Sequence, residues 1–321
     1  MVQSTHRRKR RILYVMLPIV VFTSALVSNF LSMFLEPMSA RSVVGVGTST
    51  LKKNGDTIDV YIPGAGFSGF FYTLGRLQAL HQSSYHNSSS FQYYCFSAGC
   101  LALLTSLLQL PVDSAIKLAH SSRNRWILGE ISRYDVVEHF VDGLLDVEDV
   151  DVDAPIPTEG IWNATIEQDV ECRDFQCNST QGGRVIENEQ FAVKRDEIDI
   201  RDFFPRINVI TSTWDAQHFI SQQVQQPSSV EHLKELLIQT TWIPFVTGSS
   251  FWKREGDNFH NDGAFAGLFK RQQFFYPGQY HHSLLLPWSV DLLSNGLNIL
   301  LGHDRAVHYW EEGYSRGVNA S

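Results

Sequence analysis

The feature that most constrains this chain is a glycine-rich hexapeptide, Gly64-Ala65-Gly66-Phe67-Ser68-Gly69. It follows the extended apolar run 58–62 and precedes the helix-like stretch 70–80. Glycines permit a tight turn, and a helix that begins at such a turn presents its first backbone N–H groups and the positive end of its dipole. The pattern therefore predicts a strand, a loop that stabilises negative charge, and a helix.

A second strand and helix are predicted around Ser97. The β-prone run 91–94 leads through Cys95-Phe96-Ser97-Ala98-Gly99 into the apolar stretch 101–108, which suits a buried helix. A serine on a sharp strand-to-helix turn has its hydroxyl exposed toward substrate, as a nucleophile requires. Far downstream, Asn261-Asp262-Gly263-Ala264 puts a carboxylate on a predicted loop. We expect Asp262 to reach Ser97 across the fold.

The order of these motifs resembles that of the patatin-like phospholipase family. A glycine loop, a serine about thirty residues later and a distant Asp-Gly are similar to its motifs, most closely to those of its animal-type acylglycerol lipases. Ser68 stands where those enzymes carry an apolar residue before the last glycine of the turn. The segment Thr241–Gly248 looks like their Ile-Pro segment, and the resemblance covers roughly residues 59–286.

The resemblance implies an α/β fold: a three-layer patatin-like sandwich with a mostly parallel central sheet. It also implies a serine lipid acyl hydrolase without a catalytic histidine or cofactor, acting on membrane glycerolipids. Ser97 would attack the ester carbonyl, Asp262 would accept the serine proton, and water would hydrolyse the acyl-enzyme. The implied oxyanion hole is the glycine loop, comprising Gly64, Ala65, Gly66, Ser68 and Gly69.

Cys95 departs from the family pattern, in which a glycine begins the nucleophile turn. This departure supports an alternative, a catalytically silent lipid-binding protein of the same family. We expect Cys95 and Cys100 to be small buried residues that do not form a bridge, because the turn leaves them little freedom.

Two other enzyme classes also fit parts of the pattern. The glycine loop after a strand is found in dinucleotide-binding folds, but the window 80–96 lacks the acidic residue that would hold the ribose. An α/β-hydrolase esterase with a Ser/Asp/His triad would use His303 or His308, since its chain order is serine, acid, histidine.

The N-terminus predicts a membrane anchor. A basic tail, residues 1–11, precedes the uncharged apolar segment 12–35, which is long enough for one transmembrane helix. Positive charge before the segment predicts a cytosolic tail and a luminal or extracellular remainder, a single-pass type II protein of the secretory pathway. A cleaved signal peptide ending near Met38-Ser39-Ala40 is the alternative. Residues 36–56 read as a stem linker.

The remainder, residues 57–300, is predicted to be one hydrolase domain, followed by a C-terminal tail at 301–321. An acidic insertion is expected at about 142–202, and within it Cys172 and Cys177 are candidates for a disulfide. Four glycosylation sequons lie beyond the apolar segment, at Asn87, Asn163, Asn178 and Asn319.

Composition narrows the classes further. A chain of 321 residues that is 43% hydrophobic can bury one large core or two modest ones, and the span of the motifs favours one. The net charge of −8, with no basic patch after the first dozen residues, argues against a nucleic-acid partner. The acidic run 146–153 lacks the glycine and spacing of a calcium loop, so no metal is expected. Aromatic residues gather between Phe251 and Tyr276, where they would pack the core, line an acyl groove or meet a membrane.

Overall fold

The structure is a computed structural model that describes residues 57–64, 66–83, 91–145, 198–214, 220–256, 258–266, 280–287, 289–296, 298 and 301–320. The predicted basic tail, anchor segment and stem lie outside these residues. So do the sequons at Asn87, Asn163 and Asn178, and the candidate pair Cys172 and Cys177.

A seven-stranded sheet forms the frame of the fold. Strand β1 (Ile58–Ile62) pairs in parallel with β2 (Phe91–Cys95) and with β7 (His282–Ser283), and β2 pairs in parallel with β3 (Ile207–Trp214). Beyond β3 the direction changes. Strands β4 (Ser221–Gln225) and β6 (Asn258–Asn261) pair antiparallel with β3, and β5 (Lys253–Glu255) pairs antiparallel with β6.

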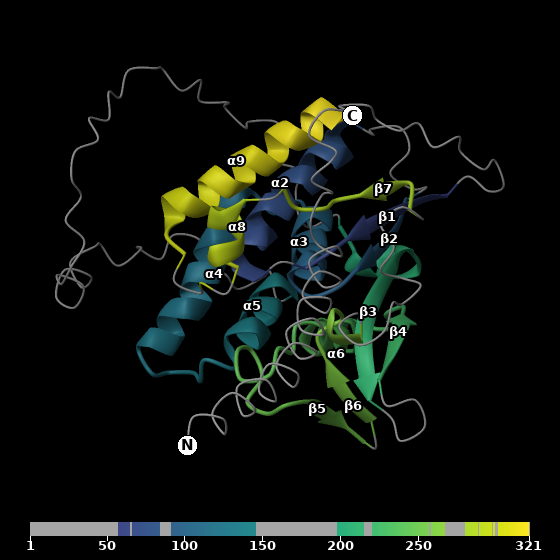
Figure 1. The fold of residues 1–321 in the computed structure, drawn as a ribbon, viewed down its shortest axis with the longest axis vertical. Coiled ribbons are helices and arrows are strands. Elements are labelled where there is room, and N and C mark those ends of the chain that lie inside the picture. Colours follow the sequence, from purple (N-terminus) through teal and green to yellow (C-terminus); the bar gives the residue numbers. More distant parts are fainter. Residues whose placement is uncertain are drawn as a thin grey trace, which may run out of the picture.

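The helices follow the strands as the sequence predicts near the two motifs. Helix α2 (Gly66–Ser83) starts in the glycine loop after β1, and α3 (Ala98–Leu107) starts directly after Ser97. Figure 1 shows α2, α4, α8 and α9 gathered to one side of the sheet. The remaining elements are α4 (Val112–Ile127), α5 (Val136–Leu145), the 3₁₀ helix η6 (Ile200–Arg206), α6 (Val230–Thr240), α8 (Val290–Ser294) and α9 (His303–Ala320).

Helix α3 is the central helix of the core. All ten of its residues are buried, because it packs against β1, β2, α2 and α5. Its sequence is apolar around most of its circumference, which is the pattern of a helix without a solvent face. The nucleophile candidate therefore sits at the start of the most deeply enclosed helix that the structure describes.

The C-terminal segment is a helix, and the prediction of a tail at 301–321 is wrong. Helix α9 packs along α2 over much of its length. The two backbones come close: a Cβ on Gly313 would lie 2.0 Å from the carbonyl oxygen of Tyr72. Tyr309 of α9 is buried, and the indole N–H of Trp310 donates to Gln78 on α2 at 2.7 Å. This helix therefore belongs to the folded domain.

The predicted fold class, a mostly parallel three-layer sandwich, is wrong, whereas the transmembrane helix predicted before it, residues 12–35, lies outside the described residues. Three strand pairings among the described residues are parallel and three are antiparallel, so the sheet is mixed. The antiparallel strands escaped prediction because β4 (SQQVQ) and β5 (KRE) carry almost no apolar residues. Within the part of the chain described here, none of the helices combines the length and apolarity needed to cross a bilayer.

The start of the predicted acidic insertion is also helical. Residues 142–145 form the last turn of α5, and Asp142 lies 2.5 Å from the Lys234 ammonium of α6. At the other end, residues 200–202 belong to η6. The insertion boundaries at 142 and 202 therefore fall inside ordered elements, and only an interval between them lies outside the described residues.

Candidate active site

Ser97 occupies a strained turn between β2 and α3. Its backbone angles are φ 53° and ψ −143°, a region that side-chain-bearing residues seldom adopt. The backbone N–H of Ser97 donates to the hydroxyl of Thr240 at 2.9 Å, and the residue is 6% exposed. Ser97 thus has the sharp strand-to-helix geometry that the sequence predicts for a nucleophile.

The glycine loop lies directly against this serine. A Cβ on Gly64 would stand 2.3 Å from Cβ and 2.9 Å from Oγ of Ser97, so only glycine fits there. Gly66, with φ 64°, borders the same cavity as Ser97. The N–H of the next residue, Phe67, donates to the carbonyl of Gly296 at 2.7 Å.

The other predicted loop residues are placed differently. Ser68 and Gly69 are buried within α2, and neither borders the cavity beside Ser97. The Ser68 hydroxyl donates to the carbonyl of Leu292 at 2.6 Å, which ties α2 to α8. Ala65 lies outside the described residues. Of the five predicted loop residues, the structure therefore places Gly64 against Ser97 and Gly66 at the same cavity.

Asp262 is a buried carboxylate on the loop after β6. It is 3% exposed, and its Oδ1 accepts a hydrogen bond from the Ala264 N–H at 2.9 Å. Burial raises the pKa of Asp262 from 3.8 to about 6, while the Ser97 hydroxyl and the Ala264 N–H act in the opposite direction. A carboxylate with this pKa is ionised at neutral pH and is still basic enough to take a proton.

The second oxygen of this carboxylate is the one available for chemistry. Oδ2 is buried and accepts no hydrogen bond of standard geometry from the described residues, although the Ser97 hydroxyl is near enough to favour the ionised form. The Ser97 hydroxyl is therefore close enough to the Asp262 carboxylate to lower its pKa, although no hydrogen bond of standard geometry to Oδ2 is present among the described residues.

A short segment at the end of α6 holds the two residues together, and its role was not predicted from the sequence. The Thr240 hydroxyl accepts from the Ser97 N–H and donates to the carbonyl of Ile210 in β3 at 2.6 Å. The Thr240 carbonyl accepts from the Gly263 N–H at 3.3 Å, and the Trp242 carbonyl accepts from the Asp262 N–H at 2.9 Å. An inward-facing threonine at the end of an amphipathic helix was the available signal.

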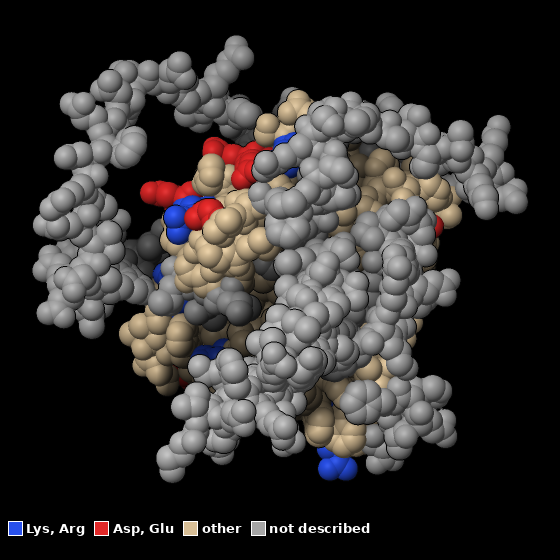
Figure 2. Space-filling model, in the orientation of Figure 1, with Lys and Arg blue, Asp and Glu red and all other residues tan. Residues whose placement is uncertain are grey.

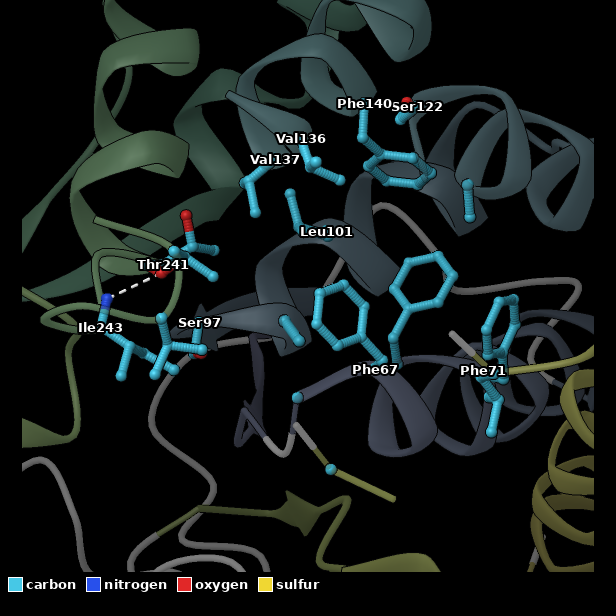
Figure 3. Close-up of a pocket in the computed structure, with 18 of the residues that line it drawn as sticks. Phe67, Phe71, Ser97, Leu101, Ser122, Val136, Val137, Phe140, Thr241 and Ile243 are labelled. Atoms are coloured by element: carbon cyan, nitrogen blue, oxygen red, sulfur yellow. Dashed lines mark hydrogen bonds between the residues drawn. The ribbon is translucent and has the colours of Figure 1, made fainter. Parts of the chain in front are cut away.

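An apolar cavity of about 80 Å³ opens beside Ser97. One water needs about 10–15 Å³ measured in this way, so the space is large enough for a segment of hydrocarbon chain. Figure 3 shows Ser97 at the border of this space, with Phe67, Leu101 and Phe140 turned toward it. Its apolar walls come from α2, α3, α4, α5 and the segment after α6, and include Phe67, Phe70, Leu101, Val136, Val137 and Phe140.

Neither histidine predicted for a triad borders this cavity. His303 lies at the start of α9, 3.8 Å from Asp113 and 3.4 Å from Asp304, and the His308 ring is tilted against that of Tyr309 with centroids 5.8 Å apart. The histidine in the cavity wall is His120, whose Nε2–H donates to the Leu301 carbonyl at 3.1 Å. Burial lowers the pKa of His120 to about 4, so its ring is neutral at pH 7.

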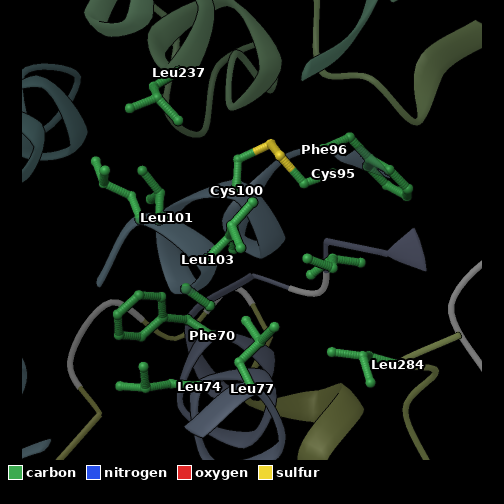
Figure 4. Close-up of a cluster of buried hydrophobic side chains, with 14 of the residues drawn as sticks. Phe70, Leu74, Leu77, Cys95, Phe96, Cys100, Leu101, Leu103, Leu237 and Leu284 are labelled. Carbon is green, nitrogen blue, oxygen red and sulfur yellow. A yellow bond between two sulfur atoms is a disulfide. The ribbon is translucent and has the colours of Figure 1, made fainter. Parts of the chain in front are cut away.

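Cys95 and Cys100 form a disulfide, and the prediction that they remain unbridged is wrong. Their Cα atoms are 5.0 Å apart, a normal spacing for a bridge. The strand-to-helix turn brings the two side chains together on the same side, which the sequence spacing of five did not reveal. Figure 4 shows the bond inside the hydrophobic core, beside Phe96 and Leu101.

The predicted aromatic cluster is divided between surface and core. Phe251 and Trp252 are 42% and 40% exposed and contact Trp214 and Phe259, whereas Phe265 is partly buried against the core. The members from 267 to 276 lie outside the described residues. None of the described members of the cluster borders the cavity at Ser97.

Among the residues described and visible in Figure 2, acidic and basic side chains lie close together over α9, and no continuous basic area is seen. The sequon residue Asn319 is exposed near the end of the same helix.

Comparisons of the chain with protein-family models, with curated proteins and with solved structures found no match. The resemblance to patatin-like phospholipases therefore stays a prediction from the three motifs.

Proposed function

We propose that this chain is a serine hydrolase that cleaves esters of long acyl chains, with glycerolipids as the substrate class. One observation carries the proposal: Ser97 lies on a strained turn beside an apolar cavity, next to a buried carboxylate whose pKa is raised to about 6. A nucleophile, a base and a space for hydrocarbon thus meet at one place.

The reaction starts with proton transfer. Oδ2 of Asp262 accepts the Ser97 proton while Oγ attacks the ester carbonyl carbon, and a tetrahedral oxyanion forms. We infer that the backbone N–H groups of Gly66 and Ala98 stabilise this oxyanion. Both residues border the cavity at Ser97, and Ala98 begins α3, where the helix dipole favours negative charge.

The remaining steps release the alcohol, hydrolyse the acyl-enzyme and return the enzyme to its starting state. The carbon–oxygen bond to the alcohol breaks, and the leaving alkoxide takes the proton held by Asp262. Water then loses a proton to Asp262 as its oxygen attacks the acyl carbon, and Ser97 leaves with that proton. Each proton that Asp262 accepts is given back within the same half-reaction.

The cavity supports an acyl chain as the bound part of the substrate. Its walls are almost wholly apolar, and Phe70 meets Phe140 edge-on with ring centroids 5.5 Å apart. The polar groups in the wall are occupied: the hydroxyl of Ser122 donates to Leu118, and His120 donates to Leu301. A polar or charged substrate group would find few partners there.

Covalent labelling tests the proposal. A fluorophosphonate should label the wild-type chain at one serine, and Ser97→Ala should abolish both labelling and ester hydrolysis. Ser106→Ala is the matched control, because Ser106 lies on the same helix but its hydroxyl contacts His81 at 3.0 Å. A wild-type chain that neither labels nor hydrolyses any acyl ester would instead support the silent lipid-binding alternative.

A further inference from the structure

The Cys95–Cys100 disulfide brackets the proposed nucleophile. Cys95 is the last residue of β2, Cys100 lies in the first turn of α3, and Ser97 stands between them. Figure 4 shows the bond packed beside Phe96 and Leu103 in the core. A covalent bond therefore closes the same short loop that carries the reactive hydroxyl.

The two ends of this loop are not equally fixed. Cys95 is held in the sheet, where it pairs with Ile62 of β1 and Val209 of β3. Cys100 belongs to the first turn of a helix, and its N–H donates to the carbonyl of Ser97 itself at 3.0 Å. The disulfide thus ties the start of the helix, and through it the serine backbone, to a rigid strand.

Such a tie matters because the Ser97 backbone is strained. A serine with φ 53° stays in that region only where its surroundings enforce it. Other restraints exist: Thr240 accepts from the Ser97 N–H, and a Cβ on Gly99 would meet the Pro63 carbonyl oxygen at 2.5 Å. The disulfide is the covalent restraint on the loop, and the one whose presence depends on redox conditions.

We propose that the Cys95–Cys100 disulfide positions Ser97, so that the site works only in chains that have formed this bond. The inference rests on the proposed function, in which Ser97 is the nucleophile. Its consequence is that activity belongs to chains folded in an oxidising compartment. A chain folded in the presence of a dithiol reductant keeps two thiols at these positions, and Ser97 loses the covalent restraint on its strained backbone conformation.

Burial of the two sulfur atoms determines how the dependence of activity on the disulfide can be observed. Cys95 is 0% and Cys100 is 2% exposed, so a thiolate cannot reach either sulfur without opening the turn. Reduction, when it occurs, transfers two electrons from a dithiol, breaks the S–S bond, and leaves two protein thiols and the oxidised dithiol. We therefore expect the folded protein to resist mild reductant and the effect to appear when the bond never forms.

The test compares two cysteine pairs in the full chain. Cys95→Ala/Cys100→Ala should lower the fluorophosphonate labelling rate and kcat by at least about tenfold, with KM changed less than about twofold. Each single variant should match the double one, because either removes the same bond. The matched control is Cys172→Ala/Cys177→Ala, which should label at the wild-type rate.

A local structural measurement separates positioning from general destabilisation. Amide hydrogen exchange at residues 99 and 100, whose N–H groups donate to Phe96 and Ser97, should become at least about tenfold faster in the Cys95→Ala/Cys100→Ala variant. Exchange in β1 and β3 should stay unchanged. If this variant does not fold, wild-type chain refolded with excess dithiol, and then reoxidised, provides the same comparison.

Two results would overturn the proposal: free thiols at both positions in oxidised, active wild-type chain, or a Cys95→Ala/Cys100→Ala variant that labels at the wild-type rate. A wild-type chain that never labels would sink the proposed function instead. In that case the exchange rates at residues 99 and 100 still decide whether the bond holds the turn.

Discussion

Asp262→Asn is the substitution that best separates the proposed catalytic role of this carboxylate from its effect on stability. The pKa of Asp262 is about 6 in the folded chain against an ordinary value of 3.8. A difference of about two on the pKa scale corresponds to about 3 kcal/mol. Since the group is fully enclosed, screening by solvent does not reduce this figure substantially.

The direction in which stability changes with pH follows from which state of the chain binds the proton of Asp262. Between pH 3.8 and about 6, the folded chain holds a proton on Asp262 that the unfolded chain has released. The contribution of this group is therefore fully present at low pH and is lost as the pH rises toward about 6. An asparagine side chain at this position cannot titrate. The free energy of unfolding of Asp262→Asn, relative to wild type, should rise by about 2–3 kcal/mol between about pH 4 and pH 8.

Urea unfolding followed by tryptophan fluorescence at several pH values measures this difference. All other titrating groups are shared, so they cancel in the comparison. Ser97→Ala is an informative second variant, because it removes the hydroxyl that lowers the Asp262 pKa. The loss of stability that follows deprotonation of Asp262 should therefore extend to higher pH in this variant than in wild type. Asp262→Asn should also lose ester hydrolysis.

A stability difference between Asp262→Asn and wild type that stays constant within about 0.5 kcal/mol from about pH 4 to pH 8 would refute the reasoning. It would mean that the folded chain does not hold Asp262 in a protonated form at low pH. The carboxylate would then be solvated or paired in solution, and its proposed role as a base poised near neutrality would lose its support.

Two further predictions concern one residue that contacts Ser97 and one that lines the cavity beside it. Thr240→Val should reduce turnover and cost about 1–3 kcal/mol of stability, since it removes the hydroxyl that pairs with the Ser97 N–H and the Ile210 carbonyl, whereas Thr240→Ser should retain both hydrogen bonds. Labelling rates and urea unfolding of the two variants check this, and equal effects of the two substitutions would contradict it. Phe140→Ala should extend the cavity and shift kcat/KM toward longer acyl chains, at a stability cost of about 3–5 kcal/mol. A series of esters of increasing chain length measures the shift, and an equal loss of kcat/KM at every chain length would argue against an acyl pocket.

The local elements around the site were predictable from the sequence. The run 58–62, the glycine loop and the helix after it form β1 and α2, and Ser97 stands at the turn between β2 and α3. These features depend on near neighbours in the chain: apolar runs of strand length, glycines at the turn, and a long apolar helix. Such patterns are predictable because they depend on interactions between residues that are close in the sequence and not on contacts with distant segments.

The tertiary structure alone decided the rest. The sheet is mixed because β4, β5 and β6 pair through their backbones, and polar strands such as SQQVQ leave no apolar signal. Residues 303–320 form a helix that is buried on one side because α2 offers it a close surface. Thr240 has its role because it contacts Ser97 and Ile210, which are 143 and 30 positions away in the chain. The Cys95–Cys100 bond required the turn geometry that brings two side chains together. Contacts between distant segments depend on how the chain folds back on itself, and neither composition nor periodicity predicts which segments will meet.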